Sequence, residues 1–317
     1  HEKDFYLSLY KEGIPLKATA GINHFAQWQG RHSDVGALGG SLEDYYKVFF
    51  GHGAETSEIK GEIINSQGNH LGYWDWRLQI PMDRVEMGLY WMYPFEDGSG
   101  LQMGTLGDGI YGYHLTNKGY LPGWFNQAVV EFIYTKTQTG PGYSDPTGEE
   151  GGNVDEHGDR YGGRDNFYNN YVYQDGWTYH GLNMGMPLMI TQKQHINYLG
   201  EPTLERASTF TSNRVKAYHI GFSANPHPDI LMKINATYAY HSGTYHSLDS
   251  AAGGDFREYP DLRSNYVFYP ALEQFYSQVK FNYRLNQRYT LDLALGWDSG
   301  ELYHSAGIVA GIKVDIK

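Results

Sequence analysis

The sequence predicts an all-β protein of the membrane-spanning kind, a transmembrane antiparallel up-and-down β-barrel. Apolar and polar residues alternate over many segments, these segments are about 10 to 14 residues long, and short and long connections alternate between them. Strands of about 9–11 residues cross a bilayer when tilted, whereas strands of soluble proteins usually have about 5–6 residues. A soluble β-sandwich also alternates, but its core would not tolerate charged residues on strand after strand.

Composition narrows the possible classes further. Hydrophobic residues make up 40% of the 317 residues, and no apolar run reaches the roughly 20 residues of a transmembrane helix. The formal net charge of −12 argues against nucleic acid as a partner, because a phosphate backbone requires a basic surface. The absence of cysteine excludes disulfide bonds and thiolate metal sites.

The segment 288–298 shows the alternation most clearly. Its apolar side carries leucines with an aromatic residue at each end, which is typical of strands that meet both membrane interfaces. The other side is polar or small, as expected for a water-filled lumen. The polar residues that we expect to face the lumen are Asp75, Arg77, Arg84, Glu86, Glu131, Gln278, Lys280 and Asp292.

The chain 1–317 is expected to form one domain with eleven strands, each recognised by such an alternation. The expected strands are 4–10, 15–28, 70–80, 84–93, 106–115, 125–137, 213–224, 229–241, 271–284, 288–298 and 302–316. Short links such as "PMDR", "NPHPD" and "LNQ" favour tight turns, which in outer-membrane barrels lie at the periplasmic end. The long connections are therefore expected at the cell surface; they are residues 29–70, 138–212 and 242–270.

The strand count is odd, whereas bacterial single-chain barrels have even counts. Either one strand is miscounted or strands are missing. An unclosed barrel would leave unpaired backbone groups in lipid. We therefore expect that the barrel has an N-terminal portion that precedes His1.

The connection 29–70 contains a helix signal. Ser41 can cap a helix, Asp44 follows three residues later, and apolar residues continue with helical spacing. A short helix over 41–50 is therefore predicted inside this outer loop.

The long connection 138–212 carries the candidate binding residues. Its stretch 162–179 mixes aromatic rings with planar amide and charged groups, which suits carbohydrate: rings stack on sugars, and amides and charges bond hydroxyl groups. The same residues could instead only hold the loop together. The candidate polysaccharide-binding residues are Arg164, Asp165, Asn166, Tyr168, Asn169, Asn170, Tyr171, Trp177 and Tyr179.

No metal site or cofactor is expected. Asp155, Asp159 and Asp165 could offer oxygen ligands to a hard cation, but their spacing does not match an EF-hand loop.

Several stretches in order resemble the Wzi capsule-assembly family of outer-membrane proteins, in its branch with long outer loops. The longest and most specific is "GGRDNFYNNYVYQDGWTYHGLNMGMPL" (162–188). The others are "GINHFAQWQG" (21–30), "SLEDYYKVFFG" (41–51), "FEDGSG" (95–100), "GDGIYGYHL" (107–115), "EFIYTKTQTGP" (131–141) and "NRVKAYHIGFS" (213–223).

The resemblance implies an eighteen-stranded barrel plugged by helical and loop elements, of which this chain would supply about eleven strands. It also implies a surface lectin in the bacterial outer membrane that binds or anchors capsular polysaccharide or exopolysaccharide and aids capsule assembly. The expected partners are that polysaccharide, outer-membrane lipid including lipopolysaccharide, and other outer-membrane proteins or the missing part of the same barrel.

Other functions compete with this one. A saccharide-selective or general channel would share the polar lumen, and the chain could be a structural subunit of a larger outer-membrane complex. Lumen carboxylates such as Asp75, Glu86 and Glu131, or His241, could support glycoside hydrolysis, but no nucleophile motif or metal-binding spacing accompanies them. An enzyme is therefore not expected.

Overall fold

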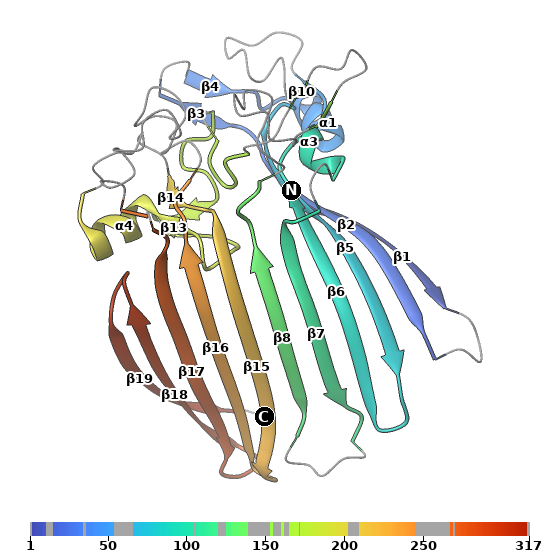
Figure 1. The fold of residues 1–317 in the computed structure, drawn as a ribbon, viewed down its shortest axis with the longest axis vertical. Helices are drawn as coiled ribbons and strands as arrows, with labels where there is room; N and C mark the ends of the chain where they lie inside the picture. Colours follow the sequence, from blue (N-terminus) through green and yellow to red (C-terminus); the bar gives the residue numbers. More distant parts are fainter. Residues whose placement is uncertain are drawn as a thin grey trace.

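The protein is built around one large antiparallel β-sheet (Figure 1). A computed structural model describes residues 2–10, 15–33, 36–53, 66–103, 106–119, 125–138, 153–154, 160–161, 165–170, 172–201, 209–244, 267–268 and 270–315. Eleven strands form the sheet, and each pairs with the next main strand along the chain. The predicted eleven-stranded antiparallel sheet is thus confirmed.

The strands of this sheet are long, from eight to 13 residues. They are β1 (Glu2–Tyr10), β2 (Lys17–Gln27), β5 (Asn69–Pro81), β6 (Val85–Phe95), β7 (Gly109–Asn117), β8 (Gln127–Tyr134), β15 (Val215–His227), β16 (Ile230–His241), β17 (Leu272–Arg284), β18 (Tyr289–Gly300) and β19 (Ser305–Val314). Tight turns join strands at one end of the sheet, and the described helices and small ladders gather at the other, called here the upper end (Figure 1).

The register aligns the apolar residues of neighbouring strands on one face of the sheet, the apolar face. A row of aromatic residues crosses seven neighbouring strands, each residue directly opposite the next. The row consists of Trp76, Trp91, Tyr111, Phe132, Tyr218, Tyr238 and Phe275. Below it, Leu89, Val130 and Ile220 are each more than 50% exposed. The apolar face is therefore not covered by the described part of the chain.

The predicted helix forms as α1 (Leu42–Phe50). Ser41 caps it and exchanges hydrogen bonds with Asp44 in a capping box, and Gly51 ends it in the left-handed conformation with φ 71°. Two helices were not predicted, α3 (Gly98–Leu101) and α4 (Gln192–Leu199); α4 also begins with a capping box. Among the described residues, no helix has the length and apolar character needed to span a membrane.

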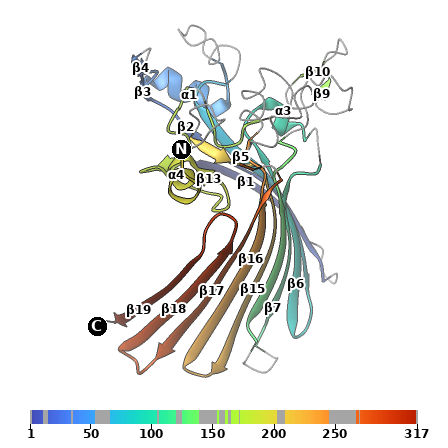
Figure 2. The same cartoon turned by 60° about the vertical axis from the view of Figure 1, so that its left-hand side comes forward.

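The other face of the sheet, the polar face, is covered near its upper end by the cap segment, residues 165–170 and 172–201. Within the cap segment lie α4, the ladder of β11 (Thr178–Tyr179) with β12 (Leu182–Asn183), and β13 (Ile190–Thr191), which pairs with β14 (Phe210–Ser212). Figure 2 shows α4 and β13 beside the upper ends of the curved sheet. Separate small ladders are β3 (Gly30–His32) with β4 (Gly36–Leu38) and β9 (Asn153–Val154) with β10 (Arg160–Tyr161).

Side-chain packing shows which face of the sheet the cap segment covers. Its Leu188 is buried against Ile133, Ala217 and Ala239. Ile133 lies two residues beyond Glu131 on β8 and so shares its face, because side chains alternate along a strand. The cap segment therefore lies on the polar face and not on the apolar one.

Candidate functional site

Asn213, just before β15, connects the cap segment to the sheet through hydrogen bonds. Its Nδ2 donates hydrogen bonds to Asn166 Oδ1 at 2.6 Å and to the Phe167 carbonyl at 2.7 Å, and its Oδ1 accepts one from Gln138 Nε2 at 3.0 Å. Asn213 and Gln138 are fully buried. A buried amide that loses such partners costs about 1–3 kcal/mol, so these bonds define one position for the cap segment.

The cap segment is also held at two distant parts of the sheet. Near the end of β6, the Tyr168 amide donates a hydrogen bond to the Glu96 carboxyl group. Near β18, the Tyr198 ring lies 4.5 Å from the Tyr303 ring, centre to centre. The cap segment therefore reaches from the β6 side of the polar face to the β18 side.

The Glu96 contact has unusual electrostatics. Burial raises the pKa of Glu96 well above its usual value, and the negative charges of Asp165 and Asp97 raise the pKa further, although the Tyr168 amide favours the charged form. Burial also raises the pKa of the Tyr168 hydroxyl group to about 12. These shifts favour an uncharged contact between the cap segment and the end of β6.

Most of the predicted polysaccharide-binding residues lie inside the cap segment. Trp177 is 9% exposed and packs with Phe167 and Phe210. The Tyr168 ring lies 5.3 Å from the Phe210 ring, and Asn169 bonds both the amide and the carbonyl of Phe210. These side chains support the fold of the cap segment.

The remaining predicted residues divide into three groups. Asn170 Oδ1 accepts from the amides of Val172 and Tyr173, so it shapes a turn, and the Asp165 amide donates to the Gln138 carbonyl. Arg164 and Tyr171 lie outside the described residues, as do Asp155 and Asp159. Tyr179 alone of the described set is widely open to solvent, with 68% of its surface exposed.

Tyr179 belongs to a small exposed hairpin. Tyr179 pairs with Leu182, and the two residues between them, His180 and Gly181, have φ 52° and 74°, as in a two-residue turn of type I′. The His180 ring lies 4.2 Å from the Tyr179 ring, and Lys193 Nζ donates to the His180 carbonyl at 3.1 Å. We call Tyr179, His180, Leu182 and Lys193 the hairpin tip.

Sequence reasoning missed His180 and Lys193 as part of this surface. Gly181 was a local signal for the turn, because glycine readily adopts the positive φ that this turn requires. Lys193 gave no such signal, because it comes to the hairpin only through the position of α4.

The predicted lumen-facing residues share the polar face, with one exception. Asp75 is fully buried and pairs with Arg77, with Nη2 to Oδ2 at 2.5 Å. Glu131 accepts a hydrogen bond from the Tyr90 hydroxyl group. Arg84 is the exception, because it lies in the turn between β5 and β6 and not on a strand.

The other predicted polar residues lie opposite polar residues of neighbouring strands. Gln278 lies opposite Asn235, Lys280 opposite Lys233, and Asp292 opposite Asn282, from which it accepts a hydrogen bond. Glu86 accepts a hydrogen bond of 3.3 Å from Gln79 and lies 3.9 Å from His114. The face is therefore continuous and hydrophilic, with its carboxylates engaged by nearby donors. His241, buried at its upper end, lies 3.2 Å from the Tyr276 hydroxyl group.

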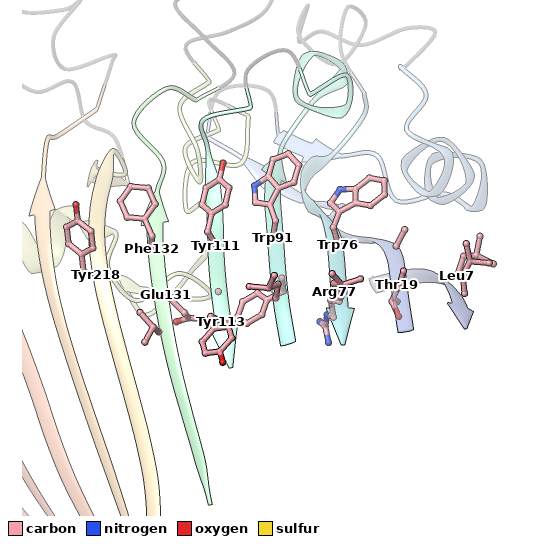
Figure 3. A pocket seen from close by; sticks show the side chains of 18 residues that line it. Leu7, Thr19, Trp76, Arg77, Trp91, Tyr111, Tyr113, Glu131, Phe132 and Tyr218 are labelled. Atoms are coloured by element: carbon pink, nitrogen blue, oxygen red, sulfur yellow. Dashed lines mark hydrogen bonds between the residues drawn. The ribbon is translucent and has the colours of Figure 1, made fainter. Parts of the chain in front are cut away.

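Two of the hollows in the described part of the chain lie outside the cap segment. The larger, about 740 Å³, is on the apolar face, and Figure 3 shows five residues of the aromatic row side by side along its border. The smaller, about 420 Å³, lies at the upper ends of β1, β2 and β5, where His24 Nε2 is 2.9 Å from His70 Nδ1. Within the described ranges, no group of His, Asp and Glu side chains is arranged to hold a metal ion.

No family model matches the sequence, and no curated protein matches it either. Among solved structures, a membrane protein from work on in-meso crystallisation is 9% identical, with a TM-score of 0.30, over 99% of this chain and 75% of that one. Outer-membrane expressed OmpT of Vibrio cholerae is 6% identical, with a TM-score of 0.26, over 98% of this chain and 52% of its own. The assignment of faces and sites therefore rests on the register and contacts of this chain.

Proposed function

We propose that the protein is an outer-membrane, lectin-like surface protein that binds capsular polysaccharide or exopolysaccharide and aids capsule assembly, as its resemblance to the Wzi family implies. One observation carries the proposal: the cap segment is fixed across the polar face and presents the hairpin tip to solvent. A rigid support with an exposed aromatic ring is suited to binding a sugar chain.

The exposed apolar face supports the membrane placement. Soluble monomers rarely expose contiguous apolar patches larger than a few hundred Å², whereas barrel strands in a membrane turn alternate residues to lipid. Here the apolar residues continue across the sheet, with an aromatic row near the end that carries the cap segment. Outer-membrane barrels carry such rows at the membrane interfaces. Short turns lie at the periplasmic end of such barrels and long loops lie outside, so we place the cap segment, at the end opposite the tight turns, outside the cell (Figure 1).

The two edge strands support a closed barrel. In the described part of the chain, β1 and β19 each pair on one side only, and their apolar residues remain exposed, such as Leu7 at 55% and Ile308 at 74%. Each unpaired backbone group in lipid costs several kcal/mol, so a membrane sheet must close. We propose that further strands pair with β1 and β19 to complete the barrel, with eighteen strands in total as in the Wzi family.

The chemistry of the hairpin tip suits a polysaccharide. The Tyr179 ring can stack on the apolar face of a sugar, and the His180 ring and Lys193 ammonium supply hydrogen bonds beside it. Each such contact is weak, but a long polymer engages many copies of the protein at once. Single substitutions should therefore lower retention of the polymer without abolishing it.

A channel is the second candidate function. It is favoured by the continuous polar face, on which residues such as Arg77, Lys280 and Asp292 would meet water. The cap segment opposes it, because it covers the upper part of that face.

The test of polysaccharide binding uses Tyr179, because Trp177 is a packing residue. We expect cells that carry Tyr179→Ala to shed several-fold more capsule into the medium than cells with the unmodified protein. Tyr179→Phe keeps the stacking ring, and cells that carry it should retain as much capsule as cells with the unmodified protein. The matched control is Tyr46→Ala, which removes another exposed ring, 56% exposed on α1. Equal amounts of each variant must reach the outer membrane. If Tyr179→Ala left capsule retention unchanged, or if Tyr179→Ala and Tyr46→Ala lowered capsule retention equally, the hairpin tip would not be the binding surface.

A further inference from the structure

Three cations gather at the upper ends of β8 and β15, near the aromatic row. They are Lys136, Arg214 and Lys216, called here the cation cluster. Lys216 on β15 lies directly opposite Tyr134 on β8 and Tyr240 on β16, two residues above Tyr218 of the row. Because side chains two residues apart share a face, Lys216 is on the apolar face, one step beyond its aromatic border.

The three cationic residues are close neighbours. Arg214 Nε donates a hydrogen bond of 3.0 Å to the Lys136 carbonyl. Burial lowers the pKa of Lys136, and the positive charges of Arg214 and Lys216 lower it further. Lys216 Nζ also lies 5.5 Å from the ring centres of both Tyr218 and Tyr240, within range of a cation–π contact.

The lysines of the cluster lack a counter-charge in the described part of the chain. Neither Lys136 nor Lys216 forms an ion pair there with a carboxylate. Glu273, two strands away in the row of Lys216, accepts a hydrogen bond from Tyr238. Two half-buried lysines without a counter-charge are unfavourable, and the chain as a whole carries −12. This arrangement fits an anionic ligand.

The position of the cluster identifies the class of ligand. Aromatic rows mark the membrane interface, so cations one step beyond the row on the lipid-facing side meet lipid head groups. Tyr218, over which Lys216 lies, also lines the 740 Å³ hollow together with Val130 and Phe132. Phosphate groups would meet the cations while an acyl chain occupied the apolar hollow, whose lining residues are drawn in Figure 3.

We propose that the cation cluster and the hollow below it bind a phosphorylated glycolipid of the outer leaflet, the lipid A class. The proposal rests on the membrane placement of the sheet and is independent of polysaccharide binding. The head-group phosphates are held by Lys136, Arg214 and Lys216, and one acyl chain lies against the aromatic row. The bound lipid would fix the height of this side of the sheet in the membrane.

The experiment measures lipid binding to the purified full chain in detergent by native mass spectrometry. The probes are bisphosphorylated lipid A and the same lipid after removal of both phosphates. We expect the phosphorylated lipid to bind about tenfold or more tightly, and Lys136→Gln with Lys216→Gln to abolish that preference, since charge-assisted bonds to two phosphates are lost. Lys136→Arg with Lys216→Arg should retain it.

The matched control changes two lysines on the other face. Lys233→Gln with Lys280→Gln removes the same charge from the polar face, where the two lysines lie opposite each other, and should leave lipid binding unchanged. Equal binding of the two lipids by the parent chain, or equal losses in the two glutamine variants, would overturn the proposal. Full displacement of the lipid by millimolar inorganic phosphate would also overturn it, because a simple anion site would then explain the binding without the hollow.

Discussion

Consecutive residues of one strand meet different surroundings in this protein, as Leu293 and Ala294 of β18 show. Leu293 is on the apolar face between Phe281 and Ala310, and 38% of it is exposed. Ala294 is on the polar face opposite Lys280. The side-chain alternation of a strand is thus enough to separate the lipid-facing position from the polar one.

We expect Leu293→Arg to lower the free energy of unfolding in bilayers by about 2–4 kcal/mol, because it places a charge in the lipid near mid-strand. Ala294→Arg should lower the free energy of unfolding by less than about 1 kcal/mol, because it only places a like charge opposite Lys280. Denaturant unfolding of the two variants in lipid vesicles gives both values. Similar costs at both positions would contradict the face assignment of β18.

The cap segment is the element that covers the upper end of the polar face. Its contact with Glu96 makes its position sensitive to pH. The folded-state pKa of Glu96 is raised, so the folded protein binds the proton more tightly than the unfolded chain. The stability that Glu96 contributes is therefore fully present below the ordinary carboxyl pKa. It is lost as the pH rises through the folded-state pKa, because the ionised group is then buried away from water, although the Tyr168 amide favours its charge.

We expect the cap segment to be cleaved faster by a protease as the pH rises, after correction for protease activity on an unfolded substrate. Glu96→Gln should flatten this dependence, because the amide oxygen still accepts the Tyr168 hydrogen bond but cannot ionise. The control is Glu201→Gln, which changes an exposed carboxyl group just after α4. A pH dependence that survives in Glu96→Gln would show that another group controls the cap segment.

At the scale of the whole molecule, the two faces of one sheet have opposite functions in our proposal. The apolar face meets lipid, and the polar face meets water and carries the cap segment. The two candidate functions differ in what the cap segment does to the pore. A fixed cap obstructs it, whereas a channel needs an open route along the polar face.

We expect the purified protein to show little or no steady conductance in planar bilayers, because the cap segment is fixed by fully buried hydrogen bonds at Asn213. Asn213→Ala removes these bonds and should produce intermittent openings, whereas Asn235→Ala, at an exposed amide of β16, should not. Large stable channels in the unmodified protein would favour the channel function instead.

Local features of the sequence determined the sheet and its first helix. Alternation with period two identified the eleven strands and their two faces, and the capping residues at Ser41 and Asp44 located α1. Such signals survive in the fold because each depends on residues a few positions apart. The strand ends shifted by a few residues, as at β8, which stops at Tyr134 and not at 137.

Only the tertiary structure decided which residues of the long loop are available for binding. Trp177 and Tyr179 look alike in the sequence, yet Trp177 is buried under Phe210 and Tyr179 is open to solvent. The same holds for the cation cluster, because Lys136 and Lys216 are 80 positions apart and meet only through the pairing of β8 with β15. Burial and charge clustering depend on contacts between distant segments, and a single sequence does not encode those contacts in any local pattern.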